Sequence, residues 1–147
     1  MTYTVSYEAG LQRTRGGWLA LLYRCKRAGD SFYQQGNASL AIQAYRQVAD
    51  TTIHLIRYGW IGRGHSGQWF VISGVMTAAD LRELLPLAAL VNLHLAACYL
   101  QLRRQWHLAL PRATYALHLI VVWRSLCAST NCVPSVGHPF TTFTIFV

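Results

Sequence analysis

The segment from residue 26 to residue 45, KRAGDSFYQQGNASLAIQAY, constrains the fold most, because it reads as two helices joined by a tight turn. Gly36 stands where a helix commonly ends in a left-handed residue that glycine adopts at little cost. Asn37 can cap the next helix by accepting a hydrogen bond from a free backbone N–H group. We therefore predict a first helix over residues 18–35 and a second over residues 38–57.

Small and large residues alternate along these two predicted helices. Gly29 and Ala41 are small where two antiparallel helices must approach closely, and Phe32 and Tyr45 are large enough to fill the space beside them. Apolar residues of the second helix recur at steps of three and four positions, at Leu40, Ala41, Ala44, Tyr45 and Val48. This pattern predicts an antiparallel pair of helices.

A similar hairpin is predicted over residues 92–117, NLHLAACYLQLRRQWHLALPRATYAL. Its small and large positions are Leu95, Ala96, Tyr99, Ala109 and Ala116. Pro111 falls in the first turn of the fourth predicted helix, residues 105–123, where a missing N–H costs little. The run from residue 117 to residue 123 is almost unbroken in its apolar character.

The third predicted helix covers residues 78–102. Thr77 can cap it, and Asp80 lies in its first turn, where a negative charge suits the helix dipole. Pro86 is expected to kink this helix or to shift its start. Its continuous apolar face is formed by Leu84, Leu87, Val91, Leu95 and Cys98.

Together these residues resemble the tetratricopeptide repeat (TPR), a helix–turn–helix unit of about 34 residues. The stretch LVNLHLAACYLQL is similar to the second repeat of the TPR domains in large FKBP-type immunophilins and related co-chaperones. The resemblance covers roughly residues 22–117, and we expect it without the isomerase domain of the immunophilins. It implies an all-α fold, an α-solenoid of two antiparallel helical hairpins, and a function as a protein–protein interaction module or co-chaperone-like adaptor.

The predicted organisation has three parts: an N-terminal arm (1–17), a TPR-like helical domain (18–123) interrupted at 58–76, and an irregular apolar tail (124–147). A repeat array needs about three repeats or a polar cap to cover its last apolar face. We therefore expect a truncated or alternatively ended version of a longer protein, which self-associates or requires a partner for solubility. A further possibility is that the chain has no independent function because its array is incomplete.

The interruption contains five glycines and two tryptophans between residues 58 and 74. We predict a surface loop whose aromatic side chains fold back onto the helices. In the alternative, a mixture of basic and aromatic residues stacks on nucleic-acid bases; its members are Arg57, Trp60, Arg63, Trp69 and Phe70. This rival function is a basic nucleic-acid or anionic-surface binder that uses Arg57, Arg63, Arg103, Arg104 and Arg124.

The amino-acid composition indicates which kinds of binding partner and which cellular compartment suit this chain. Hydrophobic residues make up 53% of the chain and charged residues only 12%, with a net charge of +8. That charge favours acidic partners, or only solubilises an apolar surface. Cys25 and Cys98 lie in helical patterns as buried thiols, and we expect no signal peptide, no membrane span, and a reducing cytoplasmic location.

The resemblance also implies a concave groove made by the first and third helices, which is expected to hold an extended peptide or a partner helix. In these co-chaperones a carboxylate clamp holds the C-terminal acid of a heat-shock chaperone; Lys26 matches the clamp lysine, whereas Asp30 and His94 replace its asparagines. The clamp is therefore predicted to be degenerate, and chaperone-tail binding is disfavoured. The predicted groove residues are Lys26, Asp30, Tyr33, His94, Cys98 and Gln101.

Catalysis and metal binding have little support in the sequence. The chain has only five acidic residues, and no nucleophile or phosphate-loop motif appears. Cys127, Cys132 and His138 are spaced too widely for a structural zinc site. We expect neither an enzyme nor a cofactor.

Overall fold

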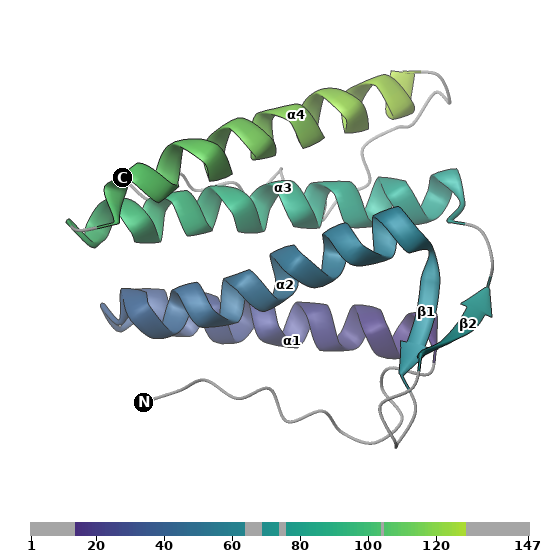
Figure 1. Cartoon of the computed structure of the whole chain (residues 1–147), viewed down its shortest axis with the longest axis horizontal. Coiled ribbons are helices and arrows are strands. Elements are labelled where there is room, and N and C mark those ends of the chain that lie inside the picture. The colour runs from purple at the N-terminus through teal and green to yellow at the C-terminus, as the bar shows by residue number, and fades with distance from the viewer. Residues whose placement is uncertain (1–13, 64–68, 74–75, 104, 129–147) are drawn as a thin grey trace. The chain divides into compact units, whose positions relative to one another are not determined.

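The computed structural model describes residues 14–63, 69–73, 76–103 and 105–128. Over these residues the fold is all-α: four helices form two helical hairpins, and a short β-hairpin lies between them in the sequence (Figure 1). The chain divides into two compact units, Met1–Met76 and Thr77–Val147.

The first unit contains α1 (Arg15–Gln34) and α2 (Ala38–Tyr58). Both helices confirm the predicted pair, but α1 begins within the predicted N-terminal arm. The reason is Thr14, whose Oγ1 accepts a hydrogen bond from the backbone N–H of Gly17 at 2.9 Å and so caps the helix. The rest of the predicted arm, residues 1–13, lies outside the described residues.

The turn between α1 and α2 is built as its sequence predicted. Gly36 has φ +76°, and its N–H donates to the carbonyl of Tyr33 at 3.0 Å. The N–H of Asn37 donates to the carbonyl of Phe32 at 2.9 Å, which completes a Schellman motif. Oδ1 of Asn37 then accepts from the N–H of Leu40 at 3.1 Å and caps α2.

The small and large positions meet where α1 and α2 pack. A Cβ atom added to Gly29 would lie 2.6 Å from Cε1 of Tyr45, so the tyrosine ring lies directly on the glycine backbone. All of the predicted apolar face of α2 is buried: Leu40, Ala41, Ala44, Tyr45 and Val48. The predicted antiparallel pair is confirmed.

The region predicted as a loop contains a β-hairpin, β1 (Trp60–Arg63) and β2 (Trp69–Ser73), in which Ile61 pairs with Val71. Trp60 is buried at 1% exposure, and the Arg15 guanidinium lies 5.4 Å from its ring centroid. Nε1 of Trp18 donates to the carbonyl of Ile61 at 2.8 Å. These contacts join β1 to the start of α1.

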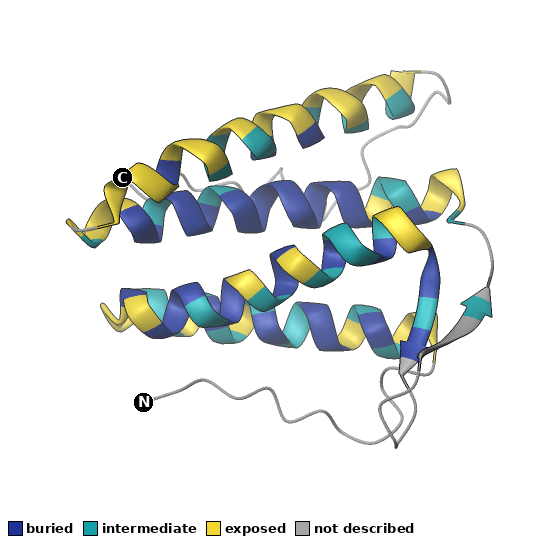
Figure 2. Cartoon of the chain, viewed as in Figure 1, coloured by how far each residue is buried: buried dark blue, intermediate teal, exposed yellow. Residues whose placement is uncertain are grey.

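In the second unit, α3 (Ala78–Gln101) begins at the predicted cap. The N–H of Asp80 donates to Oγ1 of Thr77 at 3.2 Å, and the N–H of Thr77 donates to Oδ2 of Asp80 at 3.0 Å. The helix runs through Pro86, so a proline-shifted start is wrong. The five residues of its predicted apolar face are all buried, and Figure 2 shows burial along most of α3.

A short 3-10 turn, η2 (Trp106–Leu108), leads into α4 (Ala109–Ala128). The helix starts later than predicted and extends into the predicted irregular tail. Small residues are buried in this hairpin at Ala96, Ala109 and Ala116. Arg112 joins the two helices, because its Nη1 donates to Oδ1 of the fully buried Asn92 at 3.2 Å.

Among the described helices, α3 alone is long and apolar enough to cross a membrane by length and composition. Within its most apolar window, 78% of the residues are buried in the structure. Buried core helices pass the same test, so this property does not assign α3 to a membrane. The remainder of the predicted tail, residues 129–147, lies outside the described residues.

Candidate protein-interaction site

The predicted groove residues come from both units. Lys26, Asp30 and Tyr33 lie on α1 in the first unit. His94, Cys98 and Gln101 lie on α3 in the second unit. A groove that combines residues of α1 with residues of α3 therefore stays a prediction.

Lys26 and Asp30 form an ion pair one helical turn apart. Nζ of Lys26 lies 2.7 Å from Oδ2 of Asp30, and the Tyr45 hydroxyl donates to Oδ1 of the same carboxylate at 2.5 Å. The side chains of Lys26 and Asp30 are only 20% and 25% exposed. A ligand carboxylate at Lys26 would have to compete with a carboxylate that is already in place.

The three predicted groove residues on α3 differ in exposure. Cys98 is completely buried, and His94 is 9% exposed. Gln101, at the end of the helix, is exposed. In this structure Cys98 presents no surface to a peptide, because the residues on nearly all sides of α3 are buried rather than one stripe alone.

Several exposed large apolar residues of the second unit lie on α4, and one, Leu100, lies on α3. Leu110, Leu117 and Val121 are 73%, 62% and 62% exposed, and Val122 is also exposed. We call these four residues the α4 outer face. Leu119, which belongs to the same apolar run, is instead buried. Figure 2 shows exposed residues following one another along α4.

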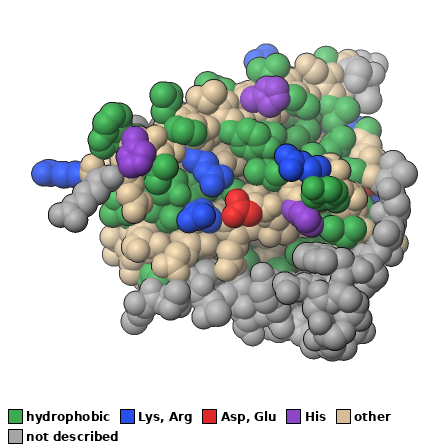
Figure 3. All heavy atoms as spheres, in the orientation of Figure 1, with side chains coloured by type: hydrophobic (Ala, Val, Ile, Leu, Met, Phe, Trp, Pro, Cys, Tyr) green, Lys and Arg blue, Asp and Glu red, His purple; other side chains and the backbone are tan. Residues whose placement is uncertain are grey.

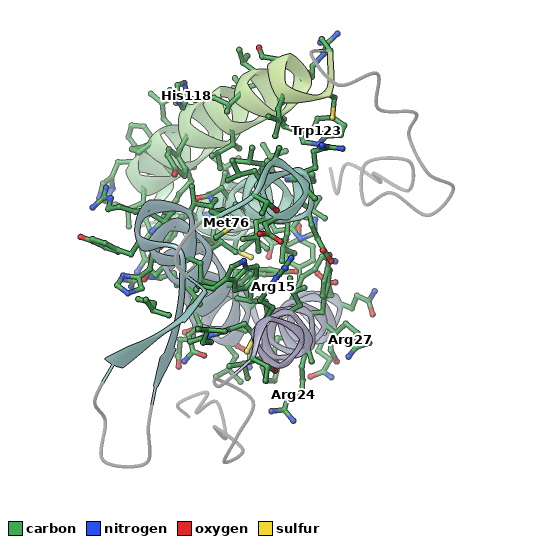
Figure 4. All side chains as sticks on the ribbon, turned by 90° about the vertical axis from the view of Figure 1, so that its right-hand side faces the viewer. Arg15, Arg24, Arg27, Met76, His118 and Trp123 are labelled. Atoms are coloured by element: carbon green, nitrogen blue, oxygen red, sulfur yellow. The ribbon has the colours of Figure 1, made fainter. Side chains whose placement is uncertain are left out.

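Exposed apolar residues continue toward the start of α4. Trp106 is 65% exposed in η2, and Leu108 follows it. Neither residue was singled out from the sequence, although both stand beside the turn between the two helices. Hydrophobic side chains gather over this part of the molecule in Figure 3. In Figure 4, His118 projects from the outer side of α4, whereas Trp123 lies on the side toward α3.

The charged residues in the sequence around the α4 outer face are all basic. The described residues from 103 to 128 include three arginines, Arg103, Arg112 and Arg124, and no aspartate or glutamate. Arg112 donates to Asn92 within the hairpin. Arg103 and Arg124 are exposed. They stand before and after the stretch of sequence that carries the outer face.

The burial of Trp60 argues against the alternative nucleic-acid-binding surface. Trp60 is buried at 1% exposure, so its ring is not available to stack on a base. Arg57 is exposed on α2, in the first unit. The side chains of Arg63, Trp69 and Phe70, as well as Arg104, lie outside what the structure describes.

Within the described ranges no three His, Cys, Asp or Glu side chains are grouped closely enough to hold a metal ion. Cys25 and Cys98 are buried as predicted, and Cys127 is half-buried. Cys132 and His138 lie outside the described residues.

Comparisons with protein-family models, with curated proteins and with solved structures each gave no match.

Proposed function

We propose that this chain is a protein–protein interaction module built from two TPR-type helical hairpins. The α4 outer face is the observation that carries the proposal. Its leucine and valine side chains are left in water on a helix whose other side is packed against α3. Exposed apolar side chains that gather on one side of a helix can mark a surface that another molecule covers.

Packing inside the hairpins supports the TPR part of the proposal. Gly29 receives the ring of Tyr45 in the first hairpin. Ala96, Ala109 and Ala116 are buried at small positions of the second. In a repeat array each hairpin covers the apolar face of its neighbour. A partner protein that packs on α4 would take the place of the next hairpin.

The predicted groove residues could bind an extended peptide as a second interaction surface, but the structure gives this surface less support than the α4 outer face. The Lys26–Asp30 ion pair disfavours an acidic chain terminus as the ligand, since Lys26 already has an internal carboxylate. A reducing, cytoplasmic location remains part of the proposal, on the sequence argument given for the cysteines. We therefore place the main binding surface on α4.

Affinity capture with two matched variants tests the proposal. Leu117→Glu puts a charge into the outer face, and Ser39→Glu puts the same charge at an exposed position of α2. We expect the parent and Ser39→Glu to capture the same proteins from a lysate of the source cells, and Leu117→Glu to lose them. Each captured protein is then purified and tested for direct binding. Circular dichroism must first show equal helix content in all three chains.

Capture of an unchanged set of proteins by Leu117→Glu would contradict the proposal, because the outer face would then be dispensable. Loss of the same proteins by Ser39→Glu would also count against it. In that case added negative charge, and not the outer face, would explain the loss. The rival nucleic-acid function predicts binding to polynucleotide that weakens steeply as salt concentration rises.

A further inference from the structure

We infer that the α4 outer face binds an amphipathic helix of another protein whose apolar seam is bordered by acidic residues. The inference rests on the proposed function and names the partner of that same surface. Three observations carry it: the spacing of the exposed side chains, the sign of the charge at both ends, and the internal use of Arg112.

The spacing favours a helix as the partner. Leu110, Leu117 and Val121 of the outer face, together with exposed Thr114, follow one another at steps of four, three and four residues. We call these four residues the seam. This is the spacing of a coiled-coil seam, into which the side chains of a second helix fit. With a rise of about 1.5 Å per residue the seam is roughly 17 Å long, so a partner helix of about four turns covers it.

The positive charge at the two ends of the seam favours a partner helix with acidic residues beside its apolar side chains. Exposed Arg103 precedes the seam and exposed Arg124 follows it, while residues 103 and 105–128 contain no acidic side chain. The whole chain has a net charge of +8. Acidic residues at the two ends of a partner helix would meet opposite charge, which raises the rate of encounter and fixes the register of the partner on the seam.

A second copy of this chain fits the surface less well. Its own α4 would bring another Arg124 and no carboxylate from residues 109–128, so neither parallel nor antiparallel pairing supplies an opposite charge. Two chains that each carry a net charge of +8 also repel one another. Charge complementarity therefore selects an acidic partner over self-association.

An anionic membrane surface also fits less well. Helices that lie in a membrane interface combine a broad apolar face with many basic residues on the polar face. On α4 the exposed residues include Thr114, His118 and Ser125, and Arg124 is its one exposed arginine. The other arginine of the helix, Arg112, donates to Asn92. The apolar face is thus narrow, and few cations accompany it.

Selection from a peptide library tests the inference. Each peptide is a helix with leucines fixed at steps of four, three and four residues, and its bordering positions are randomised among Glu, Lys, Ser and Gln. The full chain is the bait, and the Leu117→Glu chain is used for counter-selection. We expect glutamate to be enriched several-fold over lysine at the borders. The selected peptide should bind Leu117→Glu at least tenfold more weakly than the parent.

A charge reversal sharpens the result. Repeating the selection on the Arg124→Glu chain should move the preference at one end of the peptide from glutamate to lysine. The Ser39→Glu chain, which carries its new charge on α2, should select the same peptides as the parent. Enrichment of lysine, equal use of all four residues, or no enrichment over the Leu117→Glu bait would overturn the inference.

Two further measurements assign the surface to the other occupants. Sedimentation of the free chain shows whether it dimerises, and co-sedimentation with vesicles containing 30% anionic lipid shows whether it binds membranes. If the chain dimerises, or binds the vesicles, and Leu117→Glu abolishes that binding, then the second copy or the membrane is the occupant of the surface and the inference of an acidic helix is wrong. If captured proteins depend on Leu117 while the library shows no acidic preference, the proposed function stands and the inference fails.

Discussion

Gly29 and Tyr45 fit together so closely that a single methyl group at residue 29 has no room. An added Cβ atom would lie 2.6 Å from Cε1 of the tyrosine ring. The ring is 1% exposed, and its hydroxyl donates to Asp30 at 2.5 Å. The ring therefore cannot turn aside without breaking a hydrogen bond to a charged group, and this contact fixes the separation of α1 and α2.

Gly29→Ala is expected to lower the free energy of unfolding. Overpacking a close contact costs about 1–3 kcal/mol, while the better helix propensity of alanine returns only about 1 kcal/mol. Urea unfolding followed by circular dichroism measures the difference. Gly16→Ala is the matched control, because nothing lies within 4 Å of a Cβ atom at that position of α1. Equal stability of the two variants would show that the Gly29–Tyr45 contact is not tight.

Tyr45→Phe should destabilise the first hairpin by about 1 kcal/mol. Hydrogen bonds to charged groups contribute about 1.5–3 kcal/mol, and partial exposure of the Asp30 carboxylate lowers this value. Tyr58→Phe is the control, since Tyr58 is 59% exposed. Thermal unfolding of both variants gives the comparison. A Tyr45→Phe chain as stable as its control would mean that the hydroxyl contributes nothing to the α1–α2 pair.

Thr77→Ala should cost about 1 kcal/mol, within the range of roughly 0.5–2 kcal/mol for a lost N-cap. The substitution removes the side chain that accepts from Asp80 and breaks the capping box of α3. Thr114→Ala, at an exposed position of α4, is the control and should be neutral. Amide hydrogen exchange should rise in the first turn of α3 alone. Unchanged exchange there would argue that the box is not formed.

Much of the fold could be predicted because its signals are local. Gly36 and Asn37 form a turn through bonds to residues only a few positions away, and Thr77 caps α3 in the same manner. The β-hairpin could not be predicted in this way. Its register, such as Ile61 opposite Val71, joins residues across a glycine-rich stretch whose pattern indicates only a loop.

The candidate site was harder to predict than the fold. Residues on almost every side of α3 are buried, so no periodicity separates buried Cys98 from a groove residue. Apolar residues occur on all sides of α4 as well, and the sequence alone does not show that Leu117 is exposed while Leu119 is buried. The ion pair of Lys26 with Asp30 joins residues four positions apart on one helix, so the sequence could predict it. The hydrogen bond from the Tyr45 hydroxyl to Asp30 depends on the packing of α1 against α2, and the sequence could not predict it.

Photo-cross-linking from the α4 outer face tests the central claim most directly, because it reports contact and not affinity alone. Leu117 is replaced by benzoylphenylalanine in one chain, and Ser39, exposed on α2, is replaced in the control chain. After irradiation in a lysate of the source cells, adducts are identified by mass spectrometry. We predict a defined protein adduct from position 117, absent from position 39 and abolished when Val121→Glu is added. No adduct from position 117, or the same adducts from both positions, would contradict the claim that α4 is a protein-binding surface.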